Sequence, residues 1–308
     1  MIVIGSVVGI GYNSSARSFP QSASSAPVPI KFDHALICVS DLAPMQQGLT
    51  EVGLKPDYGG HHGHATTQMA QLGFPDGSYI GVEAPVDASV ETGTPQSALM
   101  KANAGACGWS ATSTDMKGDL ERISKLGVKV GEPEGRSRTR PDGTLAEWHS
   151  ASLGAGAPGS NLPFLIEDMG PRSNRAPHAS PSTVGTSISG VGVVVLGVKN
   201  LDASIALFRK VYSLPAPEVE EHPEFGAKIA YFPGTPVMLA AAASPDSWVA
   251  DRIGRLDQIP VAFLLHADDF KAALKHFSLP DGKPWFHLDV SWFDVQKLHG
   301  VRLGIIGG

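Results

Sequence analysis

The segment KFDHALICVSDL, residues 31–42, decides the fold because it runs from a buried strand directly into the start of a helix. Its apolar run predicts the strand, while Asp41 is a typical helix N-cap and Pro44 suits the first helical turn. Apolar residues at three-to-four spacing then predict one helix, which Gly53 ends.

Two strands follow this helix and complete one structural unit. The pattern predicts them at 66–72 and 78–84, joined by the turn Phe-Pro-Asp-Gly at 74–77. The unit therefore reads strand, helix, then a meander of strands. A single unit leaves the apolar face of its small sheet uncovered, so it needs a partner to be stable.

The unit is repeated along the chain. A shift of 159 residues brings Val39, Leu42, Leu49 and Pro56 onto Val198, Leu201, Phe208 and Pro215. A shift of 74 residues brings Asp41, Val52, Gly53 and Leu54 onto Asp115, Leu126, Gly127 and Val128. A fourth, shorter copy begins with VAFLLHADDFKAALKHF at 261–277. Internal repetition of this kind predicts four copies of one module.

Four modules predict an α+β fold in which the first pairs with the second and the third with the fourth. Each pair curves around a shared cleft, which gives two open-barrel domains, at 30–170 and 189–308. Residues 171–188 have the composition of a linker, and residues 1–29 that of a flexible N-terminal segment.

The composition excludes several classes of partner. Hydrophobic residues make up 42% of the chain and charged residues 18%, which is typical of a soluble globular protein. The net charge is −6 and the 24 basic residues are spread along the chain, so we expect no binding to nucleic acid. No membrane partner is expected, because no stretch reaches the ~18 apolar residues of a membrane helix. Four modules in one chain are compatible with a monomer or a homodimer.

The cysteines and the N-terminus bear on the cellular compartment. Cys38 and Cys107 are too few for a disulfide framework and lack the spacing of a zinc knuckle, so we interpret them as packing residues. The apolar start at 1–11 is similar to a signal peptide, but no basic residue precedes it. We therefore expect a cytoplasmic protein, with secretion as the alternative.

Five segments carry a resemblance to a known family: FDHALICVSDL at 32–42, GGHHGH at 59–64, LGFPDGSYIGVEAP at 72–85, RTRPDGTLAEWHSAS at 138–152 and LPFLIED at 162–168. In these segments the chain resembles the vicinal oxygen chelate superfamily, and within it the glyoxalase-like domain proteins, a group with the bleomycin-resistance proteins and extradiol dioxygenases. Residues 189–308 resemble it more loosely. The resemblance implies paired βαβββ modules that form open barrels, often with a divalent metal in the cleft, and leaves the reaction open.

Strand alternation places His34 and Glu83 together on faces turned toward the cleft of the first domain. The superfamily has metal ligands on these two strands of a module. Aligning the last strands of the first two modules puts Glu167 on Glu83, which adds a third ligand. The second module has Gly108 or Trp109 where another histidine is expected, so a four-ligand site is incomplete.

One imidazole and two carboxylates suit a divalent Mn, Fe, Zn or Ni ion with open positions for substrate oxygens. Such an ion would polarise a carbonyl while Glu83 moves the proton. No nucleotide cofactor is expected. The alternative is that His34 hydrogen-bonds Asp33 or the backbone in the core, and that Glu83 and Glu167 end their strands in water.

Other polar residues are candidates for catalysis or substrate contacts. His149, beside Trp148, could act as an acid or base or be a structural histidine. Arg138 shares a strand face with two other arginines and could clamp an acidic substrate, with a solvated edge as the alternative. His62 and His64, in a glycine-rich loop, could close over a ligand or lie in a mobile surface loop.

The third and fourth modules lack these polar residues. Val193 stands where the first module has His34, and Ala240 or Ala241 where it has Glu83. The sequence therefore predicts a glyoxalase-like enzyme with its site in the N-terminal domain, performing isomerisation, lyase or proton-abstraction chemistry on a small oxygenated substrate. The alternatives are a metal-free small-molecule binder of the drug-sequestration kind and a metal-independent acid–base enzyme that uses the same cleft.

Overall fold

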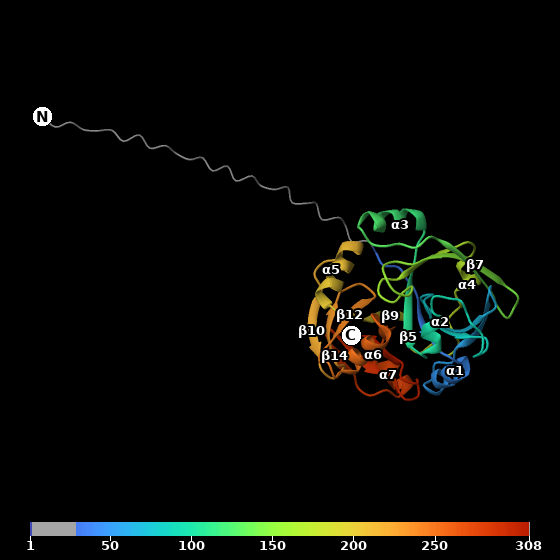
Figure 1. Cartoon of the computed structure of the whole chain (residues 1–308). Helices are drawn as coiled ribbons and strands as arrows, with labels where there is room; N and C mark the ends of the chain where they lie inside the picture. Colours follow the sequence, from blue (N-terminus) through green and yellow to red (C-terminus); the bar gives the residue numbers. More distant parts are fainter. Residues whose placement is uncertain (2–28, 308) are drawn as a thin grey trace.

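The computed structural model describes residue 1 and residues 29–307. Residues 2–28, which make up almost all of the expected N-terminal segment and of the signal-peptide alternative, lie outside the described part of the chain. Residues 32–307 form two neighbouring halves that follow each other in sequence (Figure 1).

The N-terminal half is a closed barrel of eight strands, in the order β1-β4-β3-β2-β6-β7-β8-β5. The strands are β1 (Phe32–Cys38), β2 (Asp57–His62), β3 (Thr67–Gly73), β4 (Tyr79–Pro85), β5 (Gly105–Thr112), β6 (Glu134–Thr139), β7 (Leu145–Ala151) and β8 (Phe164–Asp168). The first module supplies β1 to β4 and the second supplies β5 to β8. Three helices accompany them: α1 (Leu42–Glu51), α2 (Ser97–Lys101) and α3 (Met116–Lys125).

The C-terminal half repeats this strand order in an open sheet, β10-β11-β12-β9-β13-β16-β15-β14. Its strands are β9 (Ile188–Gly197), β10 (Glu218–His222), β11 (Ala227–Tyr231), β12 (Val237–Ala242), β13 (Ile259–Ala267), β14 (Lys283–Trp285), β15 (Leu288–Trp292) and β16 (Arg302–Gly307). Its helices are α5 (Leu201–Tyr212), α6 (Trp248–Leu256) and α7 (Phe270–Phe277). The arrangement confirms the predicted α+β fold of four modules in two pairs.

The same local signal starts the module helix in all four copies. An Asp or Asn side chain at the N-cap accepts a hydrogen bond from a backbone N–H of the first turn, at 2.9–3.1 Å. The caps are Asp41, Asp115, Asn200 and Asp269. Each helix then covers one face of its sheet. The repeat could be recognised in the sequence because the same cap signal recurs in each module.

The first strand lies in the wall of the N-terminal barrel, where it pairs with β4 in parallel and with β5 in antiparallel orientation. Its register against β5 shifts between Phe32 and His34. Regular alternation would turn Asp33 away from His34, but at this irregularity the two side chains meet. The start of β1 thus places an acid and a histidine next to each other in the barrel.

Cys38 and Cys107 form a disulfide, contrary to the prediction that they are separate packing residues. They come from the first strands of the first two modules, and the pairing of β1 with β5 brings their Cα atoms to 5.7 Å. A separation of 69 residues hid this pairing in the sequence. The expectation of a cytoplasmic protein therefore loses the support that it drew from unpaired cysteines.

The concave face of the C-terminal sheet is filled by its own side chains. Phe225 contacts Trp248, Trp285 and Trp292 through its ring, and all of these belong to one apolar cluster. The cluster also contains Val249 and Ile253 of α6, which lies against β12 and β13.

The two halves share a core. Strand β5 lies against β13, and Trp109 of β5 stacks on Phe208 of α5 with ring centroids 6.5 Å apart. The segment expected to be a linker, 171–188, contains the short helix α4 (Arg172–Arg175), and both of these arginines reach Asp33 in the barrel. This segment therefore contributes to the N-terminal site as well as joining the halves.

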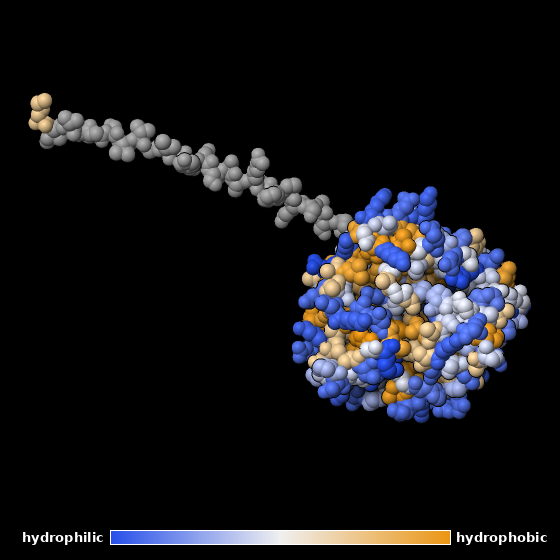
Figure 2. Space-filling view, in the orientation of Figure 1, coloured by the Kyte–Doolittle hydropathy of each residue, from blue (hydrophilic) through white to orange (hydrophobic). Residues whose placement is uncertain are grey.

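The visible face of the molecule carries hydrophilic residues over both halves, with smaller apolar areas between them (Figure 2). Within residue 1 and residues 29–307, every helix is too short or too polar to span a bilayer.

Candidate functional site

The N-terminal barrel encloses a cavity of about 180 Å³. Its wall brings together residues from β1, β2, β3, β4, β6, β7 and β8, as well as loop residues 94–96 before α2. Five of the predicted site residues on these strands line it, together with His64 of the loop after β2: His34, His62, Glu83, Arg138 and Trp148. His34 and Glu83, which strand alternation predicted to face the cleft together, both line this cavity.

His34 lies at the buried end of this cavity and is held from several sides. Its Nδ1 lies 2.7 Å from Oδ1 of Asp33 and 2.7 Å from Oγ of Ser110, its ring stacks on Tyr79 with centroids 4.5 Å apart, and the edge of Phe164 meets it. Because Asp33 is ionised, Nδ1 carries the proton and donates it to this hydrogen bond. Nε2 is then the unprotonated nitrogen, and it has no hydrogen-bond partner among the described residues.

The electrostatic surroundings keep this arrangement fixed. Burial alone would raise the pKa of Asp33, but the hydrogen bond from His34 and the charge of Arg175 hold it well below its ordinary value. Burial lowers the pKa of His34, although Asp33 acts in the opposite direction. At neutral pH the pair therefore consists of an ionised carboxylate and a neutral imidazole.

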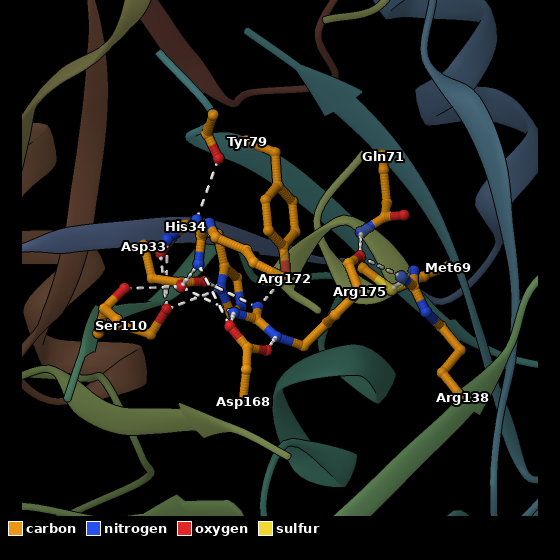
Figure 3. A network of polar contacts seen from close by, with 12 residues as sticks. Asp33, His34, Met69, Gln71, Tyr79, Ser110, Arg138, Asp168, Arg172 and Arg175 are labelled. Carbon is orange, nitrogen blue, oxygen red and sulfur yellow. Dashed lines mark hydrogen bonds and ion pairs between the residues drawn. The ribbon is translucent and has the colours of Figure 1, made fainter. Parts of the chain in front are cut away.

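Arg175 anchors Asp33 from the segment after the barrel (Figure 3). Its Nη1 and Nη2 donate to the two carboxylate oxygens of Asp33, both at 2.9 Å, and its Nε donates to Asp168 at 2.5 Å. It also donates to the hydroxyl of Tyr79 at 3.0 Å. Arg172 contacts Asp33 as well. Two carboxylates and two guanidiniums thus balance each other's charge behind His34.

Glu83 lines another part of the wall in a mostly apolar setting. Burial raises its pKa to about 7, although a hydrogen bond with Thr67 acts in the opposite direction. Oγ1 of Thr67 also lies 2.7 Å from Nδ1 of His62, and that nitrogen is 3.8 Å from Oε1 of Glu83. Burial, together with the charge of Arg138, lowers the pKa of His62 to about 3. Glu83 can therefore hold or release a proton near neutral pH beside a neutral histidine.

Arg138 lies in the same wall and is only 1% exposed. Its Nη1 donates to Sδ of Met69 at 2.8 Å and its Nη2 to the backbone carbonyl of Arg175 at 2.6 Å, while its buried Nε has no partner. Among the described residues, no carboxylate lies within ion-pair distance of this guanidinium. Burial lowers its pKa to about 10, so Arg138 remains charged at neutral pH.

The comparisons with known proteins agree with this architecture. The model of the glyoxalase-like domain matches residues 32–207, which is more than half of the chain. This chain belongs to the glyoxalase-like domain family. The match confirms the resemblance to the vicinal oxygen chelate superfamily. A search of curated proteins finds no similar sequence.

Solved structures share the fold of this glyoxalase-like domain protein at low sequence identity. A hypothetical protein from Staphylococcus aureus is 12% identical with a TM-score of 0.58, over 90% of this chain and 98% of that one. A xylose isomerase-like TIM barrel/4-hydroxyphenylpyruvate dioxygenase fusion protein is 12% identical with a TM-score of 0.56, over 92% of this chain and 49% of that one. Methylmalonyl-CoA epimerase from Mycobacterium tuberculosis is 15% identical with a TM-score of 0.35, over 40% of this chain and 90% of that one. The first two likenesses establish the fold and leave the chemistry to the site.

The residues of this glyoxalase-like domain do not fit the predicted metal centre. Glu83 lies opposite Cys38 on β4, four residues beyond the partner of His34, and its carboxyl group is directed to Thr67 and His62. Nδ1 of His34 is already bound to Asp33. Among the residues that the structure describes, no three His, Cys, Asp or Glu side chains gather into a group that could hold a metal ion.

Glu167 and His149 do not line the cavity, so the prediction of Glu167 as a ligand in the cleft is wrong, and of the two alternatives for His149 the structure favours the structural histidine. Oε1 of Glu167 accepts a hydrogen bond from the backbone N–H of Met116 at the start of α3. Its neighbour Ile166 lines the cavity instead. His149 pairs with Glu167 across β7 and β8, and the adjacent Trp148 is the residue that faces inward. The alignment of the two last strands was out of phase by one residue.

Three further residues complete the site: Asp33, which the alternative interpretation of His34 named as its hydrogen-bond partner, and Ser110 and Arg175, which the sequence did not indicate. Asp33 orients His34, Ser110 contacts the same nitrogen, and Arg175 neutralises Asp33. The Asp-His pair in FDHALICVSDL was a visible signal for the first of these. Arg175 was hidden in a segment with linker composition, 142 residues away from its partner.

Proposed function

We propose that the N-terminal barrel is a metal-independent acid–base site that moves a proton at a carbon next to a carbonyl group of a small substrate. The observation that carries this proposal is the buried Asp33–His34 pair, which presents an unprotonated imidazole nitrogen at the wall of the barrel cavity. His34 would remove the proton through Nε2, and the resulting enolate would be reprotonated or react further.

The orientation of His34 supports a role as base. An imidazole whose Nδ1–H is fixed by a carboxylate keeps its lone pair on Nε2, and the carboxylate stabilises the imidazolium that forms when Nε2 takes a proton. Tyr79 and Ser110 leave the ring little freedom to rotate. The site therefore holds its base in one tautomer and one position before a substrate arrives.

Glu83 supports the second half of the reaction. With its pKa raised to about 7 by burial, this side chain is partly protonated at neutral pH and can donate to a developing oxygen anion. Two proton-holding groups with different protonation states, His34 and Glu83, line one cavity. Such a pair is typical of general acid–base sites.

The size of the cavity limits the substrate. Its volume of about 180 Å³ is similar to the ~150 Å³ of an engineered cavity that accommodates benzene. We therefore propose substrates of a few carbon atoms rather than coenzyme-sized or polymeric ones.

Deuterium exchange tests this function. Pyruvate, 2-oxobutyrate and hydroxyacetone are incubated with the protein in D₂O, and loss of the proton signal next to the carbonyl is followed by NMR. We expect exchange above the uncatalysed rate for at least one compound, and a decrease of roughly 10²- to 10⁴-fold in His34→Asn. His149→Asn is the matched control and should keep the wild-type rate. Equal exchange in His34→Asn and the wild type would contradict the proposal, and binding without exchange would favour a small-molecule binder.

A further inference from the structure

Arg138 in the cavity wall carries a positive charge that no carboxylate of the described residues neutralises. Arg138 is 1% exposed, and its guanidinium has a thioether and a backbone carbonyl as its only acceptors among the described residues. Removing a charge from water without a counter-charge costs several kcal/mol. A buried guanidinium in this state gains the counter-charge that it lacks when an anion binds to it.

Two neighbouring arginines differ from Arg138 because their guanidiniums contact carboxylates. Arg175 donates to two carboxylates, and Arg136, also in the wall, lies 2.5 Å from Glu134. In Figure 3 the guanidinium of Arg175 lies among Asp33 and Asp168, whereas Arg138 lies apart from this cluster, beside Met69. Arg138 is thus the buried cation of the cavity that has no carboxylate of its own.

The backbone is shaped to leave room for this guanidinium. A side chain on Gly59 would place its Cβ 2.7 Å from Nη1 of Arg138 and 3.1 Å from the side chains of Gln71 and Met69. Of the three glutamates in the wall, Glu83 is directed to Thr67 and His62 and Glu134 pairs with Arg136. Glu132, the third, forms no ion pair with Arg138 in the described part of the chain. The N–H on Nε of Arg138 and one N–H on each terminal nitrogen therefore have no acceptor among the described residues.

We infer that Arg138 binds the carboxylate of the substrate, so that the site takes small monocarboxylates with a carbonyl group. A planar guanidinium matches a carboxylate with two parallel hydrogen bonds, and one uncompensated charge suits one negative charge. This inference deepens the proposed function and rests on it for the reaction, but recognition of the anion can be measured separately.

The experiment compares binding of pyruvate and of its neutral amide, pyruvamide, by isothermal titration calorimetry. We expect the wild type to prefer pyruvate, and Arg138→Met to bind pyruvate about 10- to 100-fold more weakly while its binding of pyruvamide stays the same. Arg138→Lys should keep the preference for the anion with weaker binding, which also covers the case in which Arg138→Met does not fold. Arg255→Gln removes an exposed guanidinium that is paired with Asp251 and does not line this cavity, so it is the control and should change binding by less than about 3-fold.

Two results would overturn the inference: equal affinity of the wild type for pyruvate and pyruvamide, or unchanged pyruvate binding in Arg138→Met. A site that prefers inorganic phosphate to pyruvate would also overturn it. His34→Asn separates the two proposals, because it should bind pyruvate as tightly as the wild type while losing exchange. If the wild type binds pyruvate through Arg138 without exchanging its protons, the proposed function fails and the anion site stands.

Discussion

The two halves of the chain have the same strand order but opposite interiors. In the N-terminal barrel β2 pairs with β6, the ring of strands closes, and charged side chains surround a cavity. In the C-terminal sheet the corresponding strands β10 and β14 are the two edges, and aromatic side chains fill the concave face. Positions that correspond to His34 and Leu36 hold Val193 and Val195, both in this apolar cluster.

The connecting helices explain part of this difference. Helix α6 joins the third module to the fourth and inserts Val249 and Ile253 into the C-terminal cluster. Its counterpart α2, between the first and second modules, has 5 residues instead of 9, and the segment before it lines the cavity. One fold can therefore be a packed core or a binding site, depending on what the connection between its modules supplies.

The largest expected effect on stability comes from removing Asp33, an acid that has no counterpart in the C-terminal half. Asp33→Ala leaves Arg172 and Arg175 without their shared partner and should lower the free energy of unfolding by about 3–5 kcal/mol. Urea denaturation measures this. Asp251→Ala removes an exposed ion pair with Arg255 in the C-terminal half, and its effect should stay within about 0.5 kcal/mol. Equal effects of the two changes would show that the buried network does not stabilise the barrel.

A second change tests whether the C-terminal interior is a true core. Phe225→Ala opens a void among Trp248, Trp285 and Trp292 and should cost about 3–4 kcal/mol in unfolding free energy. Trp148→Ala enlarges a cavity that already exists in the N-terminal barrel, so its cost should be at most half as large. The reverse order would mean that the C-terminal face is the looser of the two.

The pH dependence of stability tests the raised pKa of Glu83. Because the folded pKa of about 7 lies above the ordinary 4.5, the stabilisation by the protonated form is fully present below about pH 4.5 and is lost as the pH rises to about 7. Glu83→Gln should therefore be more stable than the wild type by up to about 3 kcal/mol at pH 8, with little difference at pH 4. Denaturation at both pH values measures this, with the exposed Glu134→Gln as a control that should show no such change. A wild type more stable than Glu83→Gln at pH 8 would contradict the assignment.

The smallest expected effect concerns the room left for Arg138. Gly59→Ala brings a methyl group within 2.7 Å of Nη1 and should cost about 1 kcal/mol by thermal or urea unfolding. Gly135→Ala lies on β6, four residues before the end of the strand, with nothing within 4 Å of the added carbon, and should be close to neutral. A neutral Gly59→Ala would show that Arg138 can move aside freely.

The fold could be read from the sequence because its signals are local and repeated. The helix caps, the strand meanders and the shift of 159 residues each point to the same module, and the family resemblance agreed with them. Alternation along single strands also placed His34 and Glu83 on faces turned toward the cleft, and both line the cavity. Such signals depend only on neighbours in the chain.

What the sequence could not provide depends on contacts between modules. The phase of β8, which turned Glu167 outward, is set by its pairing with β5 and β7. The disulfide between Cys38 and Cys107 needs the register of β1 against β5, and the side chain of Asp33 needs the irregularity in the same register. Arg175 enters the site from beyond the last strand of the barrel. These contacts also explain why the predicted metal ligands do not meet: His34 binds Asp33, and Glu167 binds the backbone of Met116.

The central claim is that His34, oriented by Asp33, moves a proton without the help of a metal. The most direct test is the rate of deuterium exchange into a small 2-oxo acid, measured on protein stripped of metals by a chelator, before and after addition of Mn²⁺ or Zn²⁺, and on His34→Asn. We predict the same rate with and without metal, and loss of exchange in the variant. Exchange that appears only with added metal, or that survives in His34→Asn, would contradict the account.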